Sequence, residues 1–226
     1  MTLARSTLPI RWGRIALWSV PFFTVALVQA VAIRVVAYEA FETDGPSMEP
    51  TLLDGDRFVV DKGAYGLTLP ATGQAVEHWA DPEPGVVVVL RSPADEVDII
   101  KRVVGVPGDR VEFRDDEVFV NGRSIRTGAS GPCEGSTTED AEDCEWVEET
   151  LGGHAYRTSH SRLALHESLP EQLVPPGHVF VLGDHRDRSN DSRNPRIGMV
   201  PVRRVRGPVT LVYWSEAEGR AGTWVE

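Results

Sequence analysis

Lys101 is the first residue whose type and setting could do chemistry, because it lies inside the apolar run from Asp98 to Asp109. Strand alternation would place Ile99, Lys101 and Val103 on one face. A lysine among aliphatic side chains loses solvation, and lowering its pKa from about 10.4 to about 8 needs roughly 3 kcal/mol of differential desolvation. The resulting neutral amine could accept a proton. The alternative is a lysine whose amine reaches water at a strand edge, and this run taken alone favours that alternative.

A nucleophile for such a base is available in the segment Asp44–Leu52, which reads DGPSMEPTL. Ser47 lies there between two prolines, which make the loop rigid. Most loop serines face solvent or bond to local backbone, so the segment by itself is a weak signal. It is not the nucleophile elbow of α/β hydrolases, because Glu49 occupies the position where that turn needs glycine.

A third segment, Gly183–Arg193, reads GDHRDRSNDSR and is dense in hydroxyls and in charges of both signs. It directly follows the apolar run His178–Leu182. Such a segment can hold a site in place through ion pairs and hydrogen bonds. An exposed polar turn explains the segment equally well when it is taken alone.

Short extended runs must position these three segments, and they follow one another after residue 40. They are rich in β-branched residues and bounded by Gly, Pro and Asp; they cover residues 58–60, 86–90, 97–104, 111–113, 118–120, 178–182 and 209–214. Asp115-Asp116 and Asn121-Gly122 are turn signals, and Asn-Gly favours a two-residue hairpin turn. The chain shows no repeat period, no strand–helix alternation and no Gly-rich phosphate loop. These features predict a mainly β fold built from antiparallel strands.

The N-terminal segment Ile15–Ile33 is a 19-residue run without charge. As a helix it would be about 28 Å long, close to the ~30 Å hydrocarbon thickness of a bilayer. Arg11 and Arg14 precede it and, by the positive-inside rule, hold the N-terminus in the cytoplasm. We therefore expect an uncleaved transmembrane anchor over residues 15–37. A secretory signal cleaved near Ala30-Val31-Ala32 and a buried core helix are the alternatives.

Composition places an acidic body behind this basic start. The chain has 226 residues, of which 34 are acids and 23 are Lys or Arg, so its net charge is −11. Residues 1–37 carry four arginines and no acid, so the remainder carries −15. A nucleic-acid-binding protein normally shows the opposite bias. Two cysteines without a C-x-x-C motif exclude a zinc ribbon and a disulfide-dense scaffold.

Residues 127–156 differ in composition from the rest of the body, since they hold eight acids and no Lys or Arg. We interpret them as a solvated excursion inserted into the β core. Cys133 and Cys144 bracket part of it. In an oxidising compartment they would form a local disulfide worth roughly 3 kcal/mol, and two free thiols are the alternative. Nearby histidines at zinc spacing are lacking, which argues against a metal site.

Taken together, the three segments resemble, in order and in detail, the boxes of type I signal peptidases, the serine–lysine endopeptidases that release signal peptides. Ser47–Leu52 is similar to the nucleophile box, Ile100–Asp109 to the lysine box and Gly183–Arg193 to the last box, GDxRxxSxDSR. Gly85–Pro93 is similar to the adjacent strand box, with Val86 where an Asp is common. The resemblance extends over residues 15–214.

By this resemblance, Ser47 is the nucleophile and Lys101 the general base. The backbone N–H of Ser47 would be one donor to the oxyanion. Gly45 stands where some members carry a Ser or Thr whose hydroxyl assists, so the resemblance leaves the second donor open.

The resemblance also assigns supporting residues. Ser189 corresponds to the serine whose hydroxyl orients the lysine amine. Asp191 and Arg193 correspond to the ion-pairing residues that brace the site, and Asp184 belongs to the same supporting turn. His185 replaces a common Asn. No cofactor and no metal are implied.

The fold implied by the resemblance is a signal-peptidase-like antiparallel β catalytic core with an inserted small subdomain and one N-terminal transmembrane helix. The corresponding boundaries are residues 1–14 for a cytoplasmic N-terminus, 15–37 for the anchor, 38–126 and 170–226 for the β-rich catalytic core, and 127–169 for the inserted acidic subdomain.

The function implied by the resemblance is that of a membrane-bound serine endopeptidase that cleaves signal peptides from exported preproteins. Such a protein would lie in the bacterial cytoplasmic membrane, in contact with lipid, as a monomer with its catalytic domain on the outer or periplasmic side; no nucleic acid is involved. One alternative is a specialised Ser–Lys processing peptidase of the pilus or conjugation type, and another is a non-catalytic membrane-anchored binding protein. A Ser–His–Asp enzyme could also be assembled from the six histidines, but no segment gives any of them a recognisable context.

Overall fold

The computed structural model describes residues 21, 23–29, 37–68, 75–133, 143–161 and 168–225. The chain separates into two compact units, residues 1–35 and residues 36–226. In the first unit, residue 21 and residues 23–29 are helical. Within the described ranges no helix has both the length and the apolar content needed to cross a bilayer. Most of the segment expected as an anchor, residues 15–37, lies outside the described residues, so the anchor stays a prediction.

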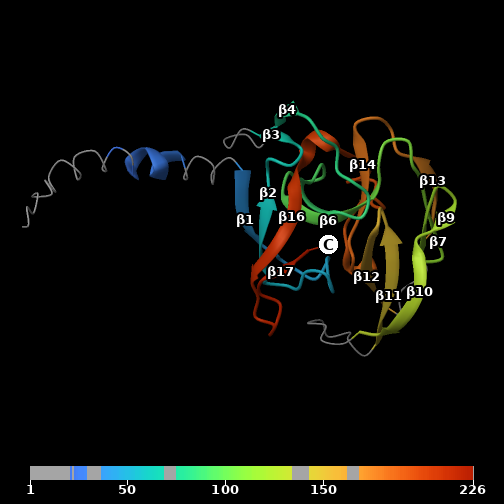
Figure 1. The fold of residues 1–226 in the computed structure, drawn as a ribbon. Coiled ribbons are helices and arrows are strands. Elements are labelled where there is room, and N and C mark those ends of the chain that lie inside the picture. Colours follow the sequence, from blue (N-terminus) through green and yellow to red (C-terminus); the bar gives the residue numbers. More distant parts are fainter. Residues whose placement is uncertain are drawn as a thin grey trace, which may run out of the picture. The chain divides into compact units, whose positions relative to one another are not determined.

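One antiparallel sheet of eight strands dominates the second unit. Its path runs β1-β2-β16-β5-β6-β14-β15, and β17 pairs with β16. Figure 1 shows β6 between β16 and β14, near the middle of the unit. The bounds of these strands are β1 Tyr38–Glu42, β2 Arg57–Asp61, β5 Val87–Arg91, β6 Asp98–Gly105, β14 His178–Leu182, β15 Val200–Pro201, β16 Val205–Trp214 and β17 Thr223–Trp224.

Smaller antiparallel sheets complete this unit. One sheet follows the order β13-β7-β8-β9, a second the order β10-β11-β12, and β3 pairs with β4. Two short 3-10 helices, η2 and η3, lie in the connections. The remaining bounds are β3 Gly66–Thr68, β4 Ala75–His78, β7 Arg110–Arg114, β8 Glu117–Val120, β9 Arg123–Ser124, β10 Arg126–Pro132, β11 Cys144–Leu151, β12 His154–Ser161, β13 Leu169–Leu173, η2 Arg186–Arg188 and η3 Val202–Arg204.

The predicted strands and turns are confirmed. All seven extended runs named from the sequence lie in or across strands β2, β5, β6, β7, β8, β14 and β16. Asn121 and Gly122 have φ of 53° and 74° between β8 and β9, the left-handed backbone that an Asn-Gly hairpin turn requires. Strands β10, β11 and β12 were not predicted, because their Glu, Ser and Thr residues hide the apolar alternation. The division of the body into a core and an inserted subdomain stays a prediction.

The central strands are buried on both faces. In β5, Val88 and Leu90 pack in one hydrophobic cluster, whereas Val87 and Val89 pack in another. A strand covered on both faces reads as a continuous apolar run rather than an alternating one. Lys101 in β6 pairs with Val88 and is only 3% exposed. The alternative of a lysine amine that reaches water at a strand edge is therefore wrong.

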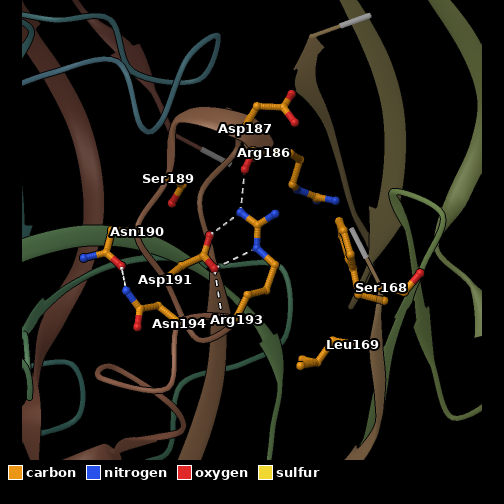
Figure 2. Close-up of a pocket in the computed structure, with 10 residues that line it drawn as sticks. Ser168, Leu169, Arg186, Asp187, Ser189, Asn190, Asp191, Arg193 and Asn194 are labelled. Atoms are coloured by element: carbon orange, nitrogen blue, oxygen red, sulfur yellow. Dashed lines mark hydrogen bonds and ion pairs between the residues drawn. The ribbon is translucent and has the colours of Figure 1, made fainter. Parts of the chain in front are cut away.

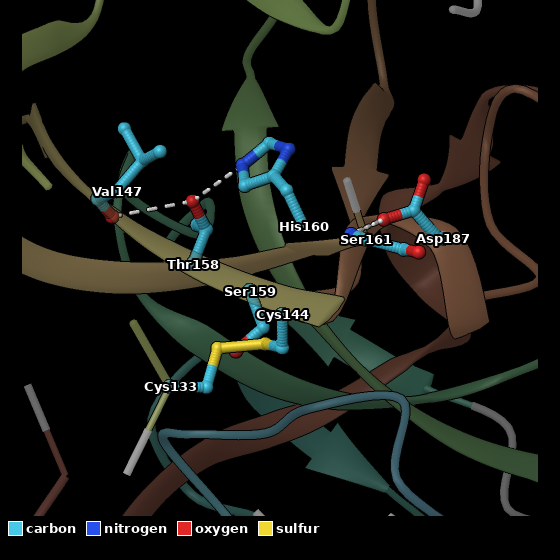
Figure 3. The surroundings of a disulfide bond; sticks show 8 residues. All are labelled: Cys133, Cys144, Val147, Thr158, Ser159, His160, Ser161 and Asp187. Atoms are coloured by element: carbon cyan, nitrogen blue, oxygen red, sulfur yellow. Dashed lines mark hydrogen bonds between the residues drawn. A yellow bond between two sulfur atoms is a disulfide. The ribbon is translucent and has the colours of Figure 1, made fainter. Parts of the chain in front are cut away.

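Cys133 and Cys144 form a disulfide, with their Cα atoms 5.3 Å apart. This confirms the predicted bond and excludes the alternative of two free thiols. The disulfide lies against β12, where Cys133 Sγ is 3.9 Å from Ser159 Oγ (Figure 3). It therefore joins β10 and β11 close to the strand that contacts η2.

Candidate active site

Ser47 and Lys101 meet although 54 positions separate them in the chain. Ser47 lies in the loop between β1 and β2, and Lys101 lies in β6. The Lys101 Nζ atom is 2.9 Å from Ser47 Oγ, and it also donates to the carbonyl oxygen of Ile100 over 2.6 Å. Among the described residues, Lys101 is the one hydrogen-bond partner of the Ser47 hydroxyl.

The setting of Lys101 favours its neutral form. Burial lowers the pKa of the amine from its ordinary 10.5 to about 8. The carboxylates of Asp191 and Asp184 raise this pKa and the Arg193 guanidinium lowers it, but burial outweighs them. A large fraction of the amine is therefore unprotonated near pH 8 and can accept the proton of a hydroxyl.

The loop that carries Ser47 is anchored on both sides of the serine. After it, the Leu52 N–H donates to the Met48 carbonyl over 2.9 Å, and both side chains are fully buried in the core cluster beside β5. Before it, the Gly45 N–H donates to Asp54 over 2.7 Å. The backbone before and after the serine is therefore held in place.

The backbone amide of Ser47 is available to a ligand. In the part of the chain that the structure describes, this N–H has no acceptor. An amide at the nucleophile that points at no protein acceptor is the kind of donor that an oxyanion requires. The Gly45 amide is already used by Asp54, and Gly45 brings no hydroxyl.

Three consecutive residues after β14 hold the Ser47 loop. A Cβ atom on Gly183 would lie 2.5 Å from the Ser47 carbonyl oxygen, so only glycine permits this close approach. The Asp184 carboxylate accepts a hydrogen bond from the Thr51 hydroxyl over 2.5 Å. The His185 N–H donates to the Ser47 carbonyl oxygen over 3.2 Å.

Asp184 forms a buried ion pair with Arg102, a site residue that the sequence reasoning missed. The guanidinium donates to the carboxylate over 2.9 and 2.7 Å, and both side chains are at most 1% exposed. The Tyr156 ring lies 3.8 Å from the guanidinium carbon. Removing one partner of such a pair leaves a buried charge, which typically costs 3–5 kcal/mol. An arginine directly after Lys101 in a buried run was the signal available in the sequence.

Asp191 and Arg193 form another ion pair beside Gly183, in which the carboxylate is buried and the guanidinium is 11% exposed. Arg193 donates to both carboxylate oxygens over 2.9 Å, and its guanidinium also contacts the Arg186 carbonyl (Figure 2). Asp191 also accepts hydrogen bonds from the Arg193 backbone N–H over 3.2 Å and from the Gly183 N–H over 3.0 Å. Burial by itself would raise the pKa of Asp191. Hydrogen bonds and charge from Arg193 and the Gly183 amide lower this pKa by more, so the net shift is downward and favours the ionised carboxylate.

The Ser189 hydroxyl is buried beside the same glycine. Its Oγ would lie 2.2 Å from a Cβ atom on Gly183. No hydrogen bond of standard geometry joins this hydroxyl to another described residue, although it is close enough to Asp191 to lower the pKa of that carboxyl. Its expected role in orienting the Lys101 amine stays a prediction.

A cavity of about 120 Å³ opens onto both Ser47 and Lys101. Its apolar lining includes Phe41 of β1, Val89 of β5 and Ile99 of β6. A larger cavity of about 550 Å³ borders Ser189, Asp191 and Arg193, but neither Ser47 nor Lys101 lines it (Figure 2). The smaller cavity is therefore the candidate site for the scissile bond.

The histidines do not complete a rival triad among the described residues. No imidazole bonds to the Ser47 hydroxyl there. His160 pairs with Thr158 at 3.0 Å, and burial lowers its pKa to about 3 (Figure 3). His166 lies outside the described residues.

Comparison with known proteins identifies the family of this chain. The family model "Signal peptidase, peptidase S26" matches residues 15–214. A signal peptidase I from Pseudomonas fluorescens is 39% identical over 211 residues, covering 87% of this chain and 72% of that protein. The corresponding values are 37%, 86% and 70% for a signal peptidase I from Pseudomonas aeruginosa, and 30%, 84% and 84% for one from Bacillus licheniformis. A crystal structure of a signal peptidase I from Enterococcus faecalis is 26% identical, covers 58% of this chain and 98% of that one, and superposes with a TM-score of 0.35.

A buried lysine beside a loop serine, on a mainly antiparallel β body, is the arrangement of a serine–lysine hydrolase. The chain belongs to the signal peptidase family, peptidase S26.

Proposed function

We propose that this protein is a serine endopeptidase that removes N-terminal signal peptides from exported preproteins, with Ser47 as nucleophile and Lys101 as general base. The observation that carries the proposal is the 2.9 Å approach of the Lys101 amine to the Ser47 hydroxyl. A pKa of about 8 supports the neutral base. Membership of the signal peptidase family supports the substrate class.

The reaction follows from this geometry in two halves. The Lys101 amine takes the proton of the Ser47 hydroxyl while Ser47 Oγ bonds to the scissile carbonyl carbon. The Ser47 amide donates to the oxyanion that forms. As the intermediate collapses, the carbon–nitrogen bond breaks and the leaving amine takes the proton from Lys101.

The second half restores the enzyme. Water attacks the acyl ester and passes a proton to Lys101. The ester bond to Ser47 Oγ then breaks, and the proton returns to the serine. Four charged residues touch no reacting atom in this scheme: Arg102, Asp184, Asp191 and Arg193. They brace the loop that carries Ser47 and the segment after β14 that contacts this loop.

The closing experiment incubates the detergent-solubilised full chain with a preprotein and maps the new N-terminus. Ser47→Ala should abolish cleavage while the far-UV circular dichroism stays unchanged. Lys101→Arg should also be inactive, because a guanidinium does not deprotonate at working pH. Normal turnover by Lys101→Arg would contradict the general-base role.

We further propose that the protein works as a monomer at the outer face of the bacterial cytoplasmic membrane. Ser47 and Lys101 come from one chain, and a disulfide is typical of proteins outside the cytosol. The uncharged run at residues 15–33 is long enough to anchor the chain in lipid. Protease added to spheroplasts should digest residues 38–226; full protection of this body would contradict the orientation.

A further inference from the structure

Thr51 joins the loop that carries Ser47 to a buried ion pair. Its hydroxyl donates to Asp184 Oδ2 over 2.5 Å and accepts a hydrogen bond from Arg102 Nη2 over 3.2 Å. The same two charged atoms are 2.7 Å apart, so the three atoms form a closed triangle of hydrogen bonds. Both partners of the hydroxyl are charged, and hydrogen bonds to charged groups are stronger than those between neutral groups.

The bond from Arg102 links this loop to the strand that carries the base. Arg102 directly follows Lys101 in β6, and its guanidinium also donates to the Gly85 carbonyl oxygen over 2.5 Å. A guanidinium held in this way fixes the position of Thr51 relative to β6. The loop and the strand are therefore joined at two places, by Lys101 with Ser47 and by Arg102 with Thr51.

The segment after β14 also contacts the loop at two places. The His185 N–H donates to the Ser47 carbonyl oxygen over 3.2 Å, and the Asp184 carboxylate accepts from the Thr51 hydroxyl. A single contact would let the loop pivot about the serine, whereas a second contact four residues further along the chain stops that rotation. The Thr51 hydroxyl supplies the second contact both to β6 and to this segment.

The backbone of the loop transmits this anchor to the serine. Two hydrogen bonds form overlapping turns between residues 46 and 52, from the Glu49 N–H to the Pro46 carbonyl over 3.0 Å and from the Leu52 N–H to the Met48 carbonyl over 2.9 Å. A shift at the threonine therefore moves the serine. Misplacing a reacting group by about 1 Å can cost about 10²-fold in rate.

We propose that Thr51 is a positioning residue whose hydroxyl holds Ser47 Oγ at reacting distance from the Lys101 amine. This inference rests on the proposed function. Among the described residues, those that line the cavity at Ser47 and Lys101 do not include Thr51, so it acts through the serine and not on the substrate. The ion pair of Arg102 with Asp184 acts on the reaction through this hydroxyl.

The test compares Thr51→Val, Thr51→Ser and Thr210→Val in the detergent-solubilised full chain, with a preprotein as substrate. Thr51→Val removes the hydroxyl and keeps the branched shape of the side chain. We expect kcat to fall about 10- to 100-fold with KM changed less than about twofold, because the serine is misplaced while the cavity stays intact. Thr51→Ser keeps the hydroxyl and should stay within about fivefold of the parent protein.

Thr210→Val is the matched control. Thr210 is half-buried like Thr51, but its hydroxyl donates to the Val59 carbonyl over 3.0 Å, inside the sheet and not in the loop. Its kcat should stay within about twofold of the parent. A kcat within twofold of the parent for Thr51→Val would overturn the proposal. Equal losses in Thr51→Val and Thr51→Ser would also overturn it, since the hydroxyl would then not be the deciding group.

Hydrogen exchange separates this inference from the proposed function. In Thr51→Val, the amides of Glu49 and Leu52 should exchange faster while those of β6 and β14 keep their protection. Unchanged exchange at these two amides would overturn the inference, and so would faster exchange throughout the body, which indicates a purely structural role. If the parent protein failed to cleave any preprotein, the proposed function would be wrong, yet the exchange result would still decide whether Thr51 holds the loop.

Discussion

At the scale of single residues, Lys101 shows how burial turns a common side chain into a base. Its side chain is 3% exposed between strands whose two faces are both covered. The nearby carboxylates of Asp191 and Asp184 limit the fall in its pKa, and without them the amine would be neutral at lower pH. The charges that brace the site therefore also raise the pH at which this amine becomes neutral.

Cleavage by the parent protein should rise with pH because only the neutral amine accepts the serine proton. With a Lys101 pKa of about 8, kcat/KM should increase about tenfold per pH unit well below 8 and level off above it. Steady-state cleavage of a peptide substrate between pH 6 and 10 measures this profile. A rate that fell between pH 7 and 9 would contradict the assignment of the base.

Replacing Lys101 should stabilise the fold at neutral pH. The folded pKa of about 8 lies below the ordinary 10.5, so the unfolded chain holds a proton between these pH values that the folded chain has lost. The free energy of unfolding therefore rises with pH through this window. Below pH 8 the folded protein carries the full cost of burying the protonated amine, on the order of 3 kcal/mol.

Lys101→Met removes that cost but also loses two hydrogen bonds, so we expect a net gain of about 1–2 kcal/mol at pH 7. Urea unfolding at pH 7 and at pH 10 measures it, and the gain should shrink at the higher pH. A variant less stable than the parent at pH 7 would show that burial of the protonated lysine costs the fold no net free energy.

At the scale of elements, the site consists of two segments that contact each other directly beside β6. The loop between β1 and β2 brings Ser47, and the segment after β14 supplies Gly183, Asp184 and His185 against it. Sequence reasoning identified both segments by their composition and by resemblance. It missed Arg102, because its partner Asp184 is distant in the sequence and comes near it only in the folded chain.

Gly183→Ala should disrupt both segments together. The new Cβ would lie 2.2 Å from Ser189 Oγ and 2.5 Å from the Ser47 carbonyl oxygen, so the backbone must shift. We expect a loss of about 1–3 kcal/mol in unfolding free energy, together with at least a tenfold drop in kcat.

Gly63→Ala is the matched control for this substitution. Its Cβ would approach only the flexible Asp61 carboxylate, at 3.3 Å, and φ is not in the left-handed region. It should leave kcat unchanged. Equal effects of the two substitutions on kcat would show that the contact between Gly183 and Ser47 does not matter.

At the scale of the whole molecule, the small sheet β10-β11-β12 connects the disulfide to the active site. The bond between Cys133 and Cys144 lies beside Ser159 of β12, and the Ser159 N–H holds the Asp184 carbonyl. The acidic segment is therefore more than a solvated excursion, because its strands support the segment that contacts Ser47.

Reduction of the disulfide should lower stability and activity together. Closing a loop of sequence separation 11 stabilises a fold by about 3 kcal/mol. Urea unfolding with and without dithiothreitol should show a loss of this order, and kcat should fall about two- to tenfold because Ser159 loses its support. The Cys133→Ser, Cys144→Ser double variant should behave like the reduced protein and should not respond to dithiothreitol. A response of that variant would mean that the reductant acts elsewhere.

The sequence by itself determined which residues could act and the class of fold that carries them. Ser47, Lys101 and the segment 183–193 were singled out by residue type and local run, and their roles followed from the resemblance of all the segments together to type I signal peptidases. Seven of the β strands followed from their apolar, β-branched runs, and the disulfide followed from the expected oxidising compartment.

Tertiary structure decided everything that depends on distance through space. Three contacts join residues that are far apart in the chain: the 2.9 Å approach of Lys101 to Ser47, the pairing of Arg102 with Asp184, and the hydrogen bond from the His185 N–H to the Ser47 carbonyl oxygen. No local pattern encodes these contacts, because desolvation and hydrogen bonding act between whichever atoms the folded chain brings together. For that reason the sequence left open whether the lysine met water or the serine, and the place of β6 inside the sheet, with the Ser47 loop against it, resolved it.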